Sequence, residues 1–424
     1  MLSCQSPQNS FGLSLALSAF CVTLFLYNSP VAADTKPSSI SIEQALDIAF
    51  SNNPELAAAE REIGIAEGAR KQAGVIPNPE LSWSVEDTRS DSRITSVQVT
   101  QPIELGGKRG ARIGVSEREQ DAAAIEFERR KNALRADVIQ AFYSALNAQE
   151  GLVLANKSLE LANRGVQVAE GRVKAGQVSP VEIARAQVQR SEAKLDFNRA
   201  MTSSRLAYKR LALVTGSQSV MFDHVAGSPD SLPTIPNKPD LLNRISQTVE
   251  VRLANKRVER DDSAIDLEKA QRIPNIDVSV GSQYDAGLRE RVNLVGLSIP
   301  LPLFDRNQGN ILSASRRADQ ARDNRNATEL RLYSEAQQAF EQWDNARNEI
   351  DSIRDDLLPV AQRTVESAVR GFEMGKFAFI DVLDAQRTLV SMRVKYLTTL
   401  DEAVSAWVVL ERIYGVQLEA RVEK

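Results

Sequence analysis

The acidic residues Asp381 and Asp384 are the pair whose spacing most directly suggests chemistry. They stand three residues apart, so on a helix both carboxylates lie on one face, one turn from each other. Two carboxylates so placed could attract a cation, or narrow a passage where several chains meet around an axis. They also follow a predicted turn, and acidic residues in the first turn of a helix are favoured by its dipole. The residues alone leave both interpretations open.

Other groups that could catalyse a reaction or hold a metal are scarce. Cys4 and Cys21 lie near the N-terminus, and His224 is the one histidine. A zinc site normally needs several His, Cys or carboxylate ligands, and a Ser–His–Asp triad would depend on this single histidine without a nucleophile motif nearby. The sequence therefore predicts no enzyme, no metal site and no cofactor, and His224 is expected to be structural or incidental.

The segment Leu105-Gly106-Gly107-Lys108-Arg109 invites comparison with a phosphate-binding loop. It lacks the GxxxxGK[ST] spacing, because an arginine follows the lysine. The glycines are better explained as the turn from a strand to a helix, with Lys108 and Arg109 placed where they can meet lipid headgroups or water. A net charge of −4 gives no basic footprint, so no nucleic-acid partner is expected.

The first 33 residues contain no Asp, Glu, Lys or Arg, and Phe11 to Tyr27 is almost continuously apolar. Small residues at Val31 and Ala33 predict a signal peptide, residues 1–33, cleaved after Ala33. The absence of basic residues at its start leaves an uncleaved membrane anchor as the alternative. Both cysteines lie in this segment, so the mature chain should have no disulfide. No later stretch is apolar over roughly 18 residues, so the mature chain could cross a membrane only with β-strands.

The chain repeats its own pattern with a period of about 198 residues. Ile76-Pro77-Asn78 recurs as Ile273-Pro274-Asn275, which is 197 residues later. Ala186-Gln187 recurs as Ala385-Gln386, which is 199 residues later. Each repeat contains both strand-like and long helical segments. The folded protein is therefore expected to use this combination of strands and long helices twice in each chain.

The duplication divides the chain into segments. We expect a first repeat at residues 34–215 and a second at residues 240–415. Residues 216–239 between them are rich in proline and serine and are expected to be a connector, with a short strand around Met221 to His224. Residues 416–424 are expected to be a C-terminal tail.

Each repeat contains an alternation of apolar and polar residues that predicts a β-hairpin, at about residues 80–104 and 276–303. In the first hairpin, Leu81, Trp83 and Val85 alternate with polar residues. The strands are about ten residues long, enough to cross a bilayer at a tilt. An isolated hairpin is marginally stable, and two hairpins cannot close a barrel, so other chains should complete the strands.

Long helical hairpins are expected after each β-hairpin, at about residues 107–215 and 306–415. In the first repeat, twelve apolar positions follow the 4-3 spacing of a coiled coil: Leu134, Val138, Ala141, Ala145, Ala148, Leu152, Ala155, Leu159, Ala162, Val166, Ala169 and Val173. A shift of 198 predicts the second seam, in which nine of the twelve positions are apolar: Leu332, Ala336, Ala339, Trp343, Ala346, Ile350, Ile353, Leu357, Val360, Thr364, Ser367 and Gly371. Pro359 interrupts this seam and predicts a kink.

In its order of segments, the chain resembles the TolC-type outer-membrane factors, the outer membrane efflux protein family. A signal peptide and a helix lead to Ile76-Pro77-Asn78-Pro79, and a hairpin and a long helical hairpin follow before the pattern repeats. Leu105 to Arg109 resembles the CzcC branch, the outer-membrane components of heavy-metal efflux systems. The second junction, Phe304-Asp305-Arg306-Asn307, does not share that pattern.

The resemblance implies a mainly α-helical fold with a small β part. Three identical chains would form a twelve-stranded barrel in the outer membrane lipid, on a long α-barrel in the periplasm of a Gram-negative cell. A periplasmic adaptor, or membrane fusion protein, would link this homotrimer to an inner-membrane RND pump. Divalent metal cations of the cobalt, zinc and cadmium type are the favoured cargo. The alternatives are a channel for drug efflux or type I protein secretion, and a periplasmic coiled-coil scaffold.

The resemblance also implies roles for the ends of the helical hairpins. The adaptor would dock on residues of the two turns: Gly176, Gln177, Val178, Gly375, Lys376 and Phe377. Asp381 and Asp384 match two acids that narrow the periplasmic entrance in the family, and Glu182 takes the equivalent position in the first repeat. Phe377 stands where some family members carry a basic residue that ties the closed aperture, so that tie is not expected here.

Overall fold

A computed structural model of the chain describes residues 39–232 and 235–415. The described residues belong to one compact unit, Pro37–Lys424. The predicted signal peptide, both cysteines and the predicted tail at residues 416–424 lie outside the described residues.

The described chain opens on a short strand and two consecutive helices: β1 (Ser39–Ile40), α1 (Ile42–Asn52) and α2 (Pro54–Ala73). At the start of α1, the side chains of Ser41 and Gln44 each accept a hydrogen bond from the other's backbone N–H, which forms a capping box. Asn53 ends α1, and its side-chain oxygen caps the first turn of α2. Pro54 starts that turn without loss of a hydrogen bond, since a first-turn N–H has no partner within the helix.

The two β-hairpins join into one antiparallel sheet of four strands: β2 (Glu80–Glu86), β3 (Ile94–Ile103), β5 (Ile276–Asp285) and β6 (Glu290–Ser298). Their order is β2-β3-β5-β6, because β3 of the first repeat pairs with β5 of the second along ten residues. The alternation predicted both hairpins, but not their pairing with each other. The outer strands β2 and β6 each keep one edge without a partner strand in the described chain.

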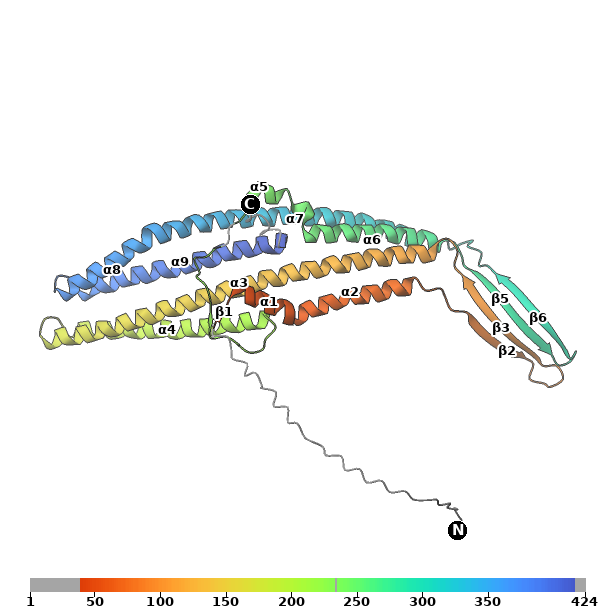
Figure 1. The fold of residues 1–424 in the computed structure, drawn as a ribbon, viewed down its shortest axis with the longest axis horizontal. Coiled ribbons are helices and arrows are strands. Elements are labelled where there is room, and N and C mark those ends of the chain that lie inside the picture. Colours follow the sequence, from red (N-terminus) through yellow and green to blue (C-terminus); the bar gives the residue numbers. More distant parts are fainter. Residues whose placement is uncertain (1–38, 233–234, 416–424) are drawn as a thin grey trace, which may run out of the picture. The chain divides into compact units, whose positions relative to one another are not determined.

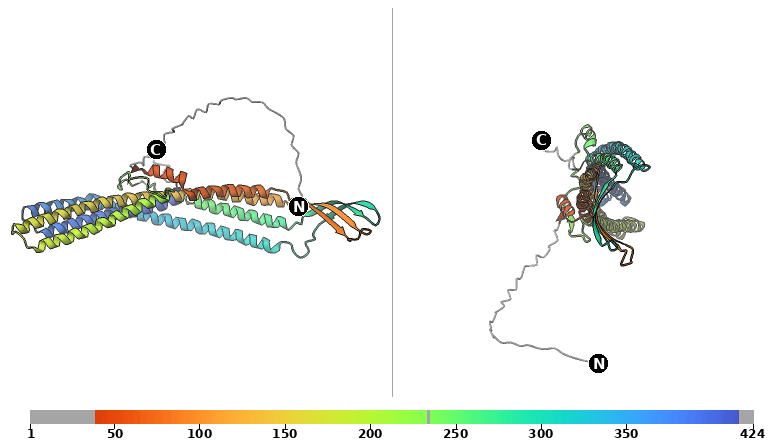
Figure 2. Two further views of the ribbon diagram at one scale, coloured as in Figure 1. Left: turned by 90° about the horizontal axis from the view of Figure 1, so that it is seen from below. Right: turned by 90° about the vertical axis from the view of Figure 1, so that its right-hand side faces the viewer.

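Long helices fill most of the rest of the structure. They are α3 (Lys108–Lys174), α4 (Val181–Val214), α6 (Val249–Gln271), α7 (Gln308–Ser352), a π-helical turn (Ile353–Leu357), α8 (Leu358–Glu373) and α9 (Phe379–Tyr414). On the side of the sheet the packing order is α2-α3-α6-α7, which repeats the order of the strands (Figures 1 and 2). Toward the hairpin turns the order is α4-α3-α9-α8. Among the described helices, none is long and apolar enough for a membrane crossing.

The connector wraps the middle of the helices. It contains β4 (His224–Val225), which pairs in parallel with β1, and its last two residues begin α5 (Lys238–Leu242), which a 3₁₀ turn (Ile245–Gln247) follows. The short strand expected around Met221 to His224 therefore begins only at His224, since its partner β1 is two residues long. Tyr143 on α3 fixes the connector by donating a hydrogen bond to the Ser231 carbonyl at 2.9 Å.

Two main clusters of buried apolar side chains hold the helices together. The middle cluster joins α1, the connector, the central part of α3 and the C-terminal parts of α7 and α9, with Phe142, Trp343 and Leu410 among its members. The tip cluster joins the turn-proximal ends of α3, α4, α8 and α9, and includes Val166 and Phe372. The helical hairpins are therefore packed tightly at two separate levels.

The predicted seam of the first repeat is confirmed, because none of its twelve residues is exposed. In the second repeat the seam is confirmed from Leu332 to Ile353, where all seven positions are buried. Beyond that point four of the five remaining positions are wrong, and only the last of them, Gly371, is buried as expected. The expected positions Leu357 and Val360 are 45% and 53% exposed, and Thr364 and Ser367 are exposed as well.

The residues that pack instead lie one position later in the sequence: Leu358, Ala361, Val365, Ala368 and Phe372. All five are apolar, so the second seam is as continuous as the first. The cause is the π turn at Ile353–Leu357, which takes up one residue more than an α-helical turn. The same extra residue is visible in the sequence, because equivalent residues of the two seams are 198 positions apart before this turn and 199 positions apart after it.

Pro359 is the second residue of helix α8, which follows the π turn directly, so the interruption lies where it was expected. Proline has no N–H to donate to the preceding turn, and its ring would clash with the carbonyl there. The wider π turn accommodates both the extra residue and the proline.

Candidate functional site

The predicted tip residues lie in the two helix-hairpin turns. At the end of α3, Gly176 has a φ of +69° and its N–H donates to the Val173 carbonyl. At the end of α8, Gly375 has a φ of +73° and its N–H donates to the Phe372 carbonyl. The following residue in each turn bonds one carbonyl further back, which completes a Schellman motif. Only glycine adopts this left-handed conformation without strain.

The second turn is filled by its own phenylalanine. The Phe377 ring lies over Gly371, where an added Cβ would come within 2.2 Å of it. Next to it, Phe372 and Phe379 pack at 5.5 Å between ring centroids. The guanidinium of Arg172 on α3 lies 4.5 Å from the Phe372 ring centroid, so the tip of the first repeat is held against the second.

Asp381 and Asp384 are both exposed, on either side of the buried pair Val382 and Leu383. They differ in what they contact. A carboxylate oxygen of Asp381 accepts a hydrogen bond from the Ala378 N–H at 2.9 Å, and so caps the start of α9. The side chain of Asp384 makes no hydrogen bond or ion pair with the described residues. Asp384 is therefore the acid whose charge is fully available to solvent or to another chain.

Glu182, the equivalent acid of the first repeat, has different surroundings. Its Oε1 pairs with Arg185 one turn later at 3.2 Å, and its side chain is 22% exposed. Its Oε2 is buried without a hydrogen bond from the described residues. Unlike the two exposed aspartates, Glu182 is therefore both partly covered and paired with a basic side chain.

The sheet has one apolar and one polar face. Across all four strands, Leu81, Val99, Val280 and Val295 stand directly opposite one another in register and form an apolar row. These four side chains are 71%, 46%, 57% and 81% exposed, respectively. The next row on the other face consists of Ser82, Gln98, Gly281 and Leu294, and its neighbouring rows are rich in Ser, Thr and Gln. Such a sheet suits lipid on one side and water on the other.

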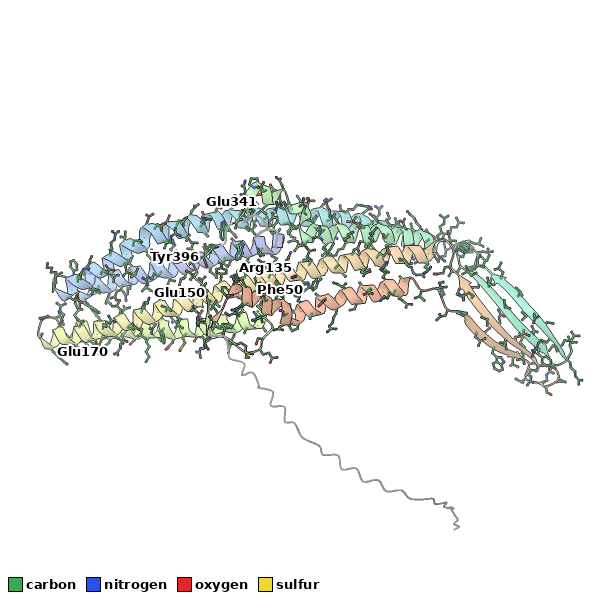
Figure 3. All side chains as sticks on the ribbon, viewed as in Figure 1. Phe50, Arg135, Glu150, Glu170, Glu341 and Tyr396 are labelled. Atoms are coloured by element: carbon green, nitrogen blue, oxygen red, sulfur yellow. The ribbon has the colours of Figure 1, made fainter. Side chains whose placement is uncertain are left out.

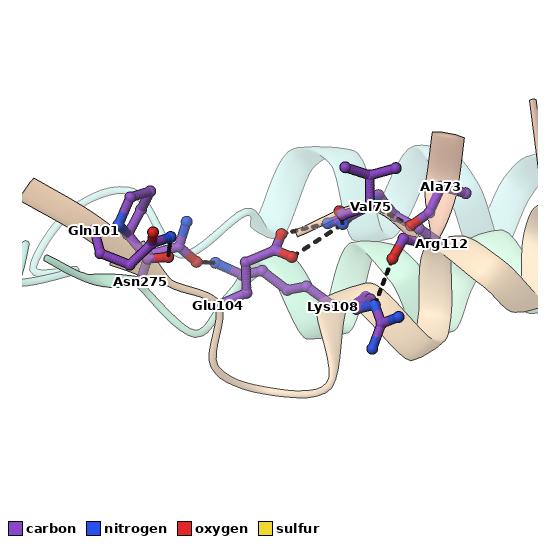
Figure 4. Close-up of polar contacts among 10 residues, drawn as sticks. Ala73, Val75, Gln101, Glu104, Lys108, Arg112 and Asn275 are labelled. Carbon is purple, nitrogen blue, oxygen red and sulfur yellow. Dashed lines mark hydrogen bonds and ion pairs between the residues drawn. The ribbon is translucent and has the colours of Figure 1, made fainter. Parts of the chain in front are cut away.

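The first strand–helix junction is held by side chains from both repeats (Figure 4). Lys108 donates to the Asn275 side chain at 2.5 Å, and Arg112 forms a bidentate ion pair with Glu104. Arg109 donates to the Gly74 carbonyl at 2.7 Å. The basic residues thus connect segments of the protein to one another. The sequence had predicted only that Lys108 and Arg109 would meet lipid headgroups or water.

At that junction both the backbone conformation and the small space left by neighbouring side chains require glycine. Gly106 has a φ of +72°, and an added Cβ would lie 2.8 Å from the Ile273 side chain. At the second junction, Asn307 takes the position of Gly107, with φ of +59° against +72°, and begins α7. The Asn307 amide donates to the backbone carbonyl of Glu268 at 2.8 Å, so the second repeat makes the same turn with a different residue.

A buried ion pair in the middle of the helices was not predicted from the sequence. Arg135 on α3, labelled in Figure 3, pairs with Glu411 near the end of α9. The Glu411 side chain is fully buried and that of Arg135 is 14% exposed. The two residues stand 276 positions apart in the sequence, so local spacing could not have connected them.

A second contact joins α9 to the connector. The Tyr396 hydroxyl, labelled in Figure 3, donates to the Asp230 carboxylate at 2.6 Å. Burial of the phenol, followed by its bond to Asp230, raises the pKa of Tyr396. The hydroxyl therefore stays protonated and keeps its role as a donor.

The described residues contain no group of three or more His, Cys, Asp or Glu side chains that could hold a metal ion. His224 lies at the exposed start of β4 in the connector. It belongs to a different part of the fold from Glu182 on α4 and from Asp381 and Asp384 on α9. The described residues therefore form a sheet with one apolar and one polar face, long helices, and acids next to the helix-hairpin turns. These are the elements expected in the wall of a channel.

Comparisons with known proteins agree with this arrangement. A sequence profile of the family described as "Outer membrane efflux protein" matches residues 45–217 and 245–416. The chain is 38% identical over 387 residues to the cobalt-zinc-cadmium resistance protein CzcC of Cupriavidus metallidurans, covering 91% of this chain and 92% of that protein. It is 28% identical over 328 residues to the nickel-cobalt-cadmium resistance protein NccC of Alcaligenes xylosoxydans xylosoxydans, covering 74% of each. The crystal structure of the Campylobacter jejuni CmeC outer membrane channel has the same fold, with a TM-score of 0.76 at 16% identity over 90% of this chain and 87% of that one.

These matches confirm the TolC-type resemblance and its CzcC branch, and the mainly helical fold with two repeats. The predictions of an outer-membrane location reaching into the periplasm, and of a channel rather than an enzyme, are confirmed by the same matches. The chain belongs to the outer membrane efflux protein family.

Proposed function

We propose that three copies of this chain close into a single channel through the outer membrane. The sheet carries the proposal, because within the described residues β2 and β6 each have one edge without a partner strand, and one sheet face exposes an apolar row. Inside a membrane every backbone N–H and C=O must be paired within protein, which an open sheet edge prevents. Four strands from each of three chains close the edges as a twelve-stranded barrel, with the apolar face toward lipid.

We further propose that the helices continue the conduit into the periplasm. Proteins of this family form trimers and work with adaptor and RND pump partners. In this chain, the two exposed turns at Gly176 and Gly375 are the expected docking sites for a periplasmic adaptor, together with Gln177, Val178, Lys376 and Phe377. The adaptor would couple the channel to an inner-membrane RND pump that supplies the energy.

We assign the periplasmic aperture to the acids at the start of α9. Asp384→Ala should raise the conductance of the closed channel in planar bilayers, since it removes one exposed charge per chain and no intramolecular bond. Asp381→Ala should raise conductance too, and should also cost about 1 kcal/mol per chain through the lost cap. Glu182→Ala serves as the comparison and should have the smallest effect, because Glu182 is already paired with Arg185. Wild-type conductance in both aspartate variants would remove the aperture role.

We propose divalent heavy-metal cations of the cobalt, zinc and cadmium type as the cargo. The support is the 38% identity to a cobalt-zinc-cadmium resistance protein along nearly the whole chain. Without a metal-binding group among the described residues, the channel would conduct these cations and leave their selection to the pump.

Growth of a deletion strain, with and without the restored gene, tests this cargo. We expect loss of tolerance to cobalt, zinc and cadmium and its recovery on complementation, with unchanged sensitivity to antibiotics. Unchanged metal tolerance with increased antibiotic sensitivity would replace the cargo by drugs. A defect only in the release of a secreted protein would favour type I secretion.

The domain organisation follows the same proposal. We assign the first repeat to residues 34–215, the connector to 216–239 and the second repeat to 240–415. The two separate matches of the family profile support this division. Residues 1–33 would be removed as a signal peptide, and mass spectrometry of the mature N-terminus would identify Asp34 as its first residue.

A further inference from the structure

Charged side chains are sorted by face at the end of the sheet that carries the β2–β3 and β5–β6 turns, here called the strand-turn end (Figure 1). At this end one row stands in register on the same face as the apolar row: Val85, Thr95, Tyr284 and Arg291. Side chains alternate between faces along a strand, so Arg93, two residues before Thr95, lies on the apolar face as well. The Ala286 N–H donates to the Arg93 carbonyl at 2.9 Å, which extends the pairing of β3 with β5 to this residue.

The opposite face carries acids at the same end. Its last row consists of Glu86, Ile94, Asp285 and Glu290, which include three acids and no basic residue. Solvation of two exposed turns requires charged residues, but it does not require one sign of charge on each face. The separation of arginines from acids therefore indicates that the two faces meet different surroundings.

The arginines of the apolar face have no partner within the described residues. Arg93, Arg291 and Arg289, the last in the β5–β6 turn, are exposed, and their guanidinium groups form no hydrogen bond or ion pair with the described chain. Arg89 in the β2–β3 turn differs, because its guanidinium donates to the Asp87 carboxylate at 2.9 and 2.5 Å. The first three guanidinium groups are thus available to a ligand from outside the chain, and that of Arg89 is not.

The height of these arginines on the sheet fits the edge of a membrane. Ten residues separate Arg93 from Ile103 at the other end of β3, which is about 34 Å along a strand. At the tilt of about 40° found in outer-membrane barrels, this distance rises about 25 Å across the membrane, the height of their apolar band. Trp83 and Tyr284 are 69% and 41% exposed and lie on this face between the apolar row and Arg93. Aromatic residues flank the apolar band of such barrels, so Arg93 lies at the level of the lipid headgroups.

The chemistry of these groups favours phosphate. A guanidinium donates two parallel hydrogen bonds to one phosphate, and it is less strongly hydrated than an ammonium group. Arg93 and Arg291 flank strand β5 from β3 and β6, which places their backbones about 10 Å apart across the sheet. Both side chains can therefore reach one headgroup that carries more than one phosphate.

From these observations we infer that Arg93 and Arg291, together with Arg289, bind the phosphates of lipid A, the phosphorylated glycolipid of the outer leaflet. The inference rests on the proposed function, because it requires the apolar face to contact lipid and the strand-turn end to lie at the cell surface. The contact would set the depth of the sheet in the membrane and leave the acids of the opposite row facing the conduit.

Binding of purified lipid A to the purified oligomer in detergent tests the site, with native mass spectrometry as the readout. Arg93→Gln combined with Arg291→Gln should weaken this binding about tenfold or more, the effect typical of losing a hydrogen bond to a charged group. Arg89→Gln is the matched control, because it removes the same charge from the same end of the sheet but a guanidinium that Asp87 already holds. Equal affinity of the double variant and the wild-type protein would overturn the site. An equal loss in Arg89→Gln would overturn it as well, since net charge alone would then explain the binding.

Further ligands identify the source of the phosphate. We expect weaker binding of phosphatidylglycerol, which has one phosphate, and no displacement of lipid A by inorganic phosphate. Equal affinity for phosphatidylglycerol, or displacement by inorganic phosphate, would overturn lipid A as the ligand. Release of lipid A by EDTA would overturn the role of the arginines, because a divalent cation on the acids would then hold the lipid.

Lysine variants separate lipid binding from assembly. Arg93→Lys with Arg291→Lys keeps both charges and should form the wild-type amount of heat-modifiable oligomer, but it lacks the planar fork and should bind lipid A more weakly. Wild-type affinity in this variant would contradict bidentate recognition of phosphate. Failure of the inference and of the proposed function are distinguishable. A wild-type protein that stays a single chain in detergent contradicts the channel, whereas an intact oligomer that binds lipid A no better than phosphatidylglycerol contradicts this inference only.

Discussion

Replacing Val99 with arginine is expected to abolish assembly of the protein in the outer membrane. Val99 lies in the apolar row, between Leu81 and Val280 on the neighbouring strands. An arginine facing lipid near the bilayer centre costs about 2–4 kcal/mol, and a trimer would carry three of them. The measurement is the amount of heat-modifiable oligomer in the outer-membrane fraction, detected by electrophoresis with and without boiling.

The matched control is the neighbouring residue on the same strand. Gln98 lies on the opposite, polar face, where it pairs with Ser82 and Gly281. Gln98→Arg would place the same charge toward a water-filled interior and should leave assembly near the wild-type level. Equal loss of oligomer in both variants would show that the apolar face does not contact lipid.

Removing one member of the buried ion pair should have the largest effect on stability. Arg135→Met leaves the fully buried carboxylate of Glu411 without this partner, which typically costs about 3–5 kcal/mol. The expected result is a marked fall in the unfolding temperature of the purified protein, followed by circular dichroism. Arg130→Met, which removes a surface pair with Glu126, is the control and should cost less than about 1 kcal/mol.

The double variant Arg135→Met with Glu411→Leu tests the physical reason. Replacing a buried ion pair by apolar residues of similar size is often neutral or stabilising, so most of the lost stability should return. A double variant as unstable as the single one would mean that the packing around these side chains, not the loss of the ion pair, lowers the stability.

Long periodic features of the fold could be predicted from the sequence. The alternation around Trp83 placed the hairpins, and the 4-3 spacing from Leu134 to Val173 placed the packed face of α3, because each pattern extends over many residues. Local sequence also explains the capping box at Ser41 and the helix boundary at Pro54, because each depends on neighbouring residues only.

Features that depend on a single residue, or on contacts between distant segments, could not be predicted. The second seam was wrong at four of its five positions after Ile353 because a constant shift of 198 ignored one inserted residue, although Ala186 and Ala385 are already 199 residues apart. The pairing of β3 with β5 and the bond between Arg135 and Glu411 join residues far apart in the chain. No local pattern encodes which distant partner such groups meet.

In the candidate site, too, some features could be predicted from local sequence and others could not. The glycine turns, and the position of Asp381 and Asp384 at the start of the helix that follows the second turn, could be predicted from local sequence. The difference between the two acids did not follow from sequence, because it depends on the bond from the Ala378 N–H to Asp381. Whether these acids form a ring depends on how the chains assemble.

Native mass spectrometry of the purified protein in detergent tests that assembly most directly. The account predicts one dominant species with the mass of three mature chains, because only then do the open edges of β2 and β6 find partners in a closed twelve-stranded barrel. A dominant species of one or two chains would contradict the account, since it would leave those edges unpaired within the membrane.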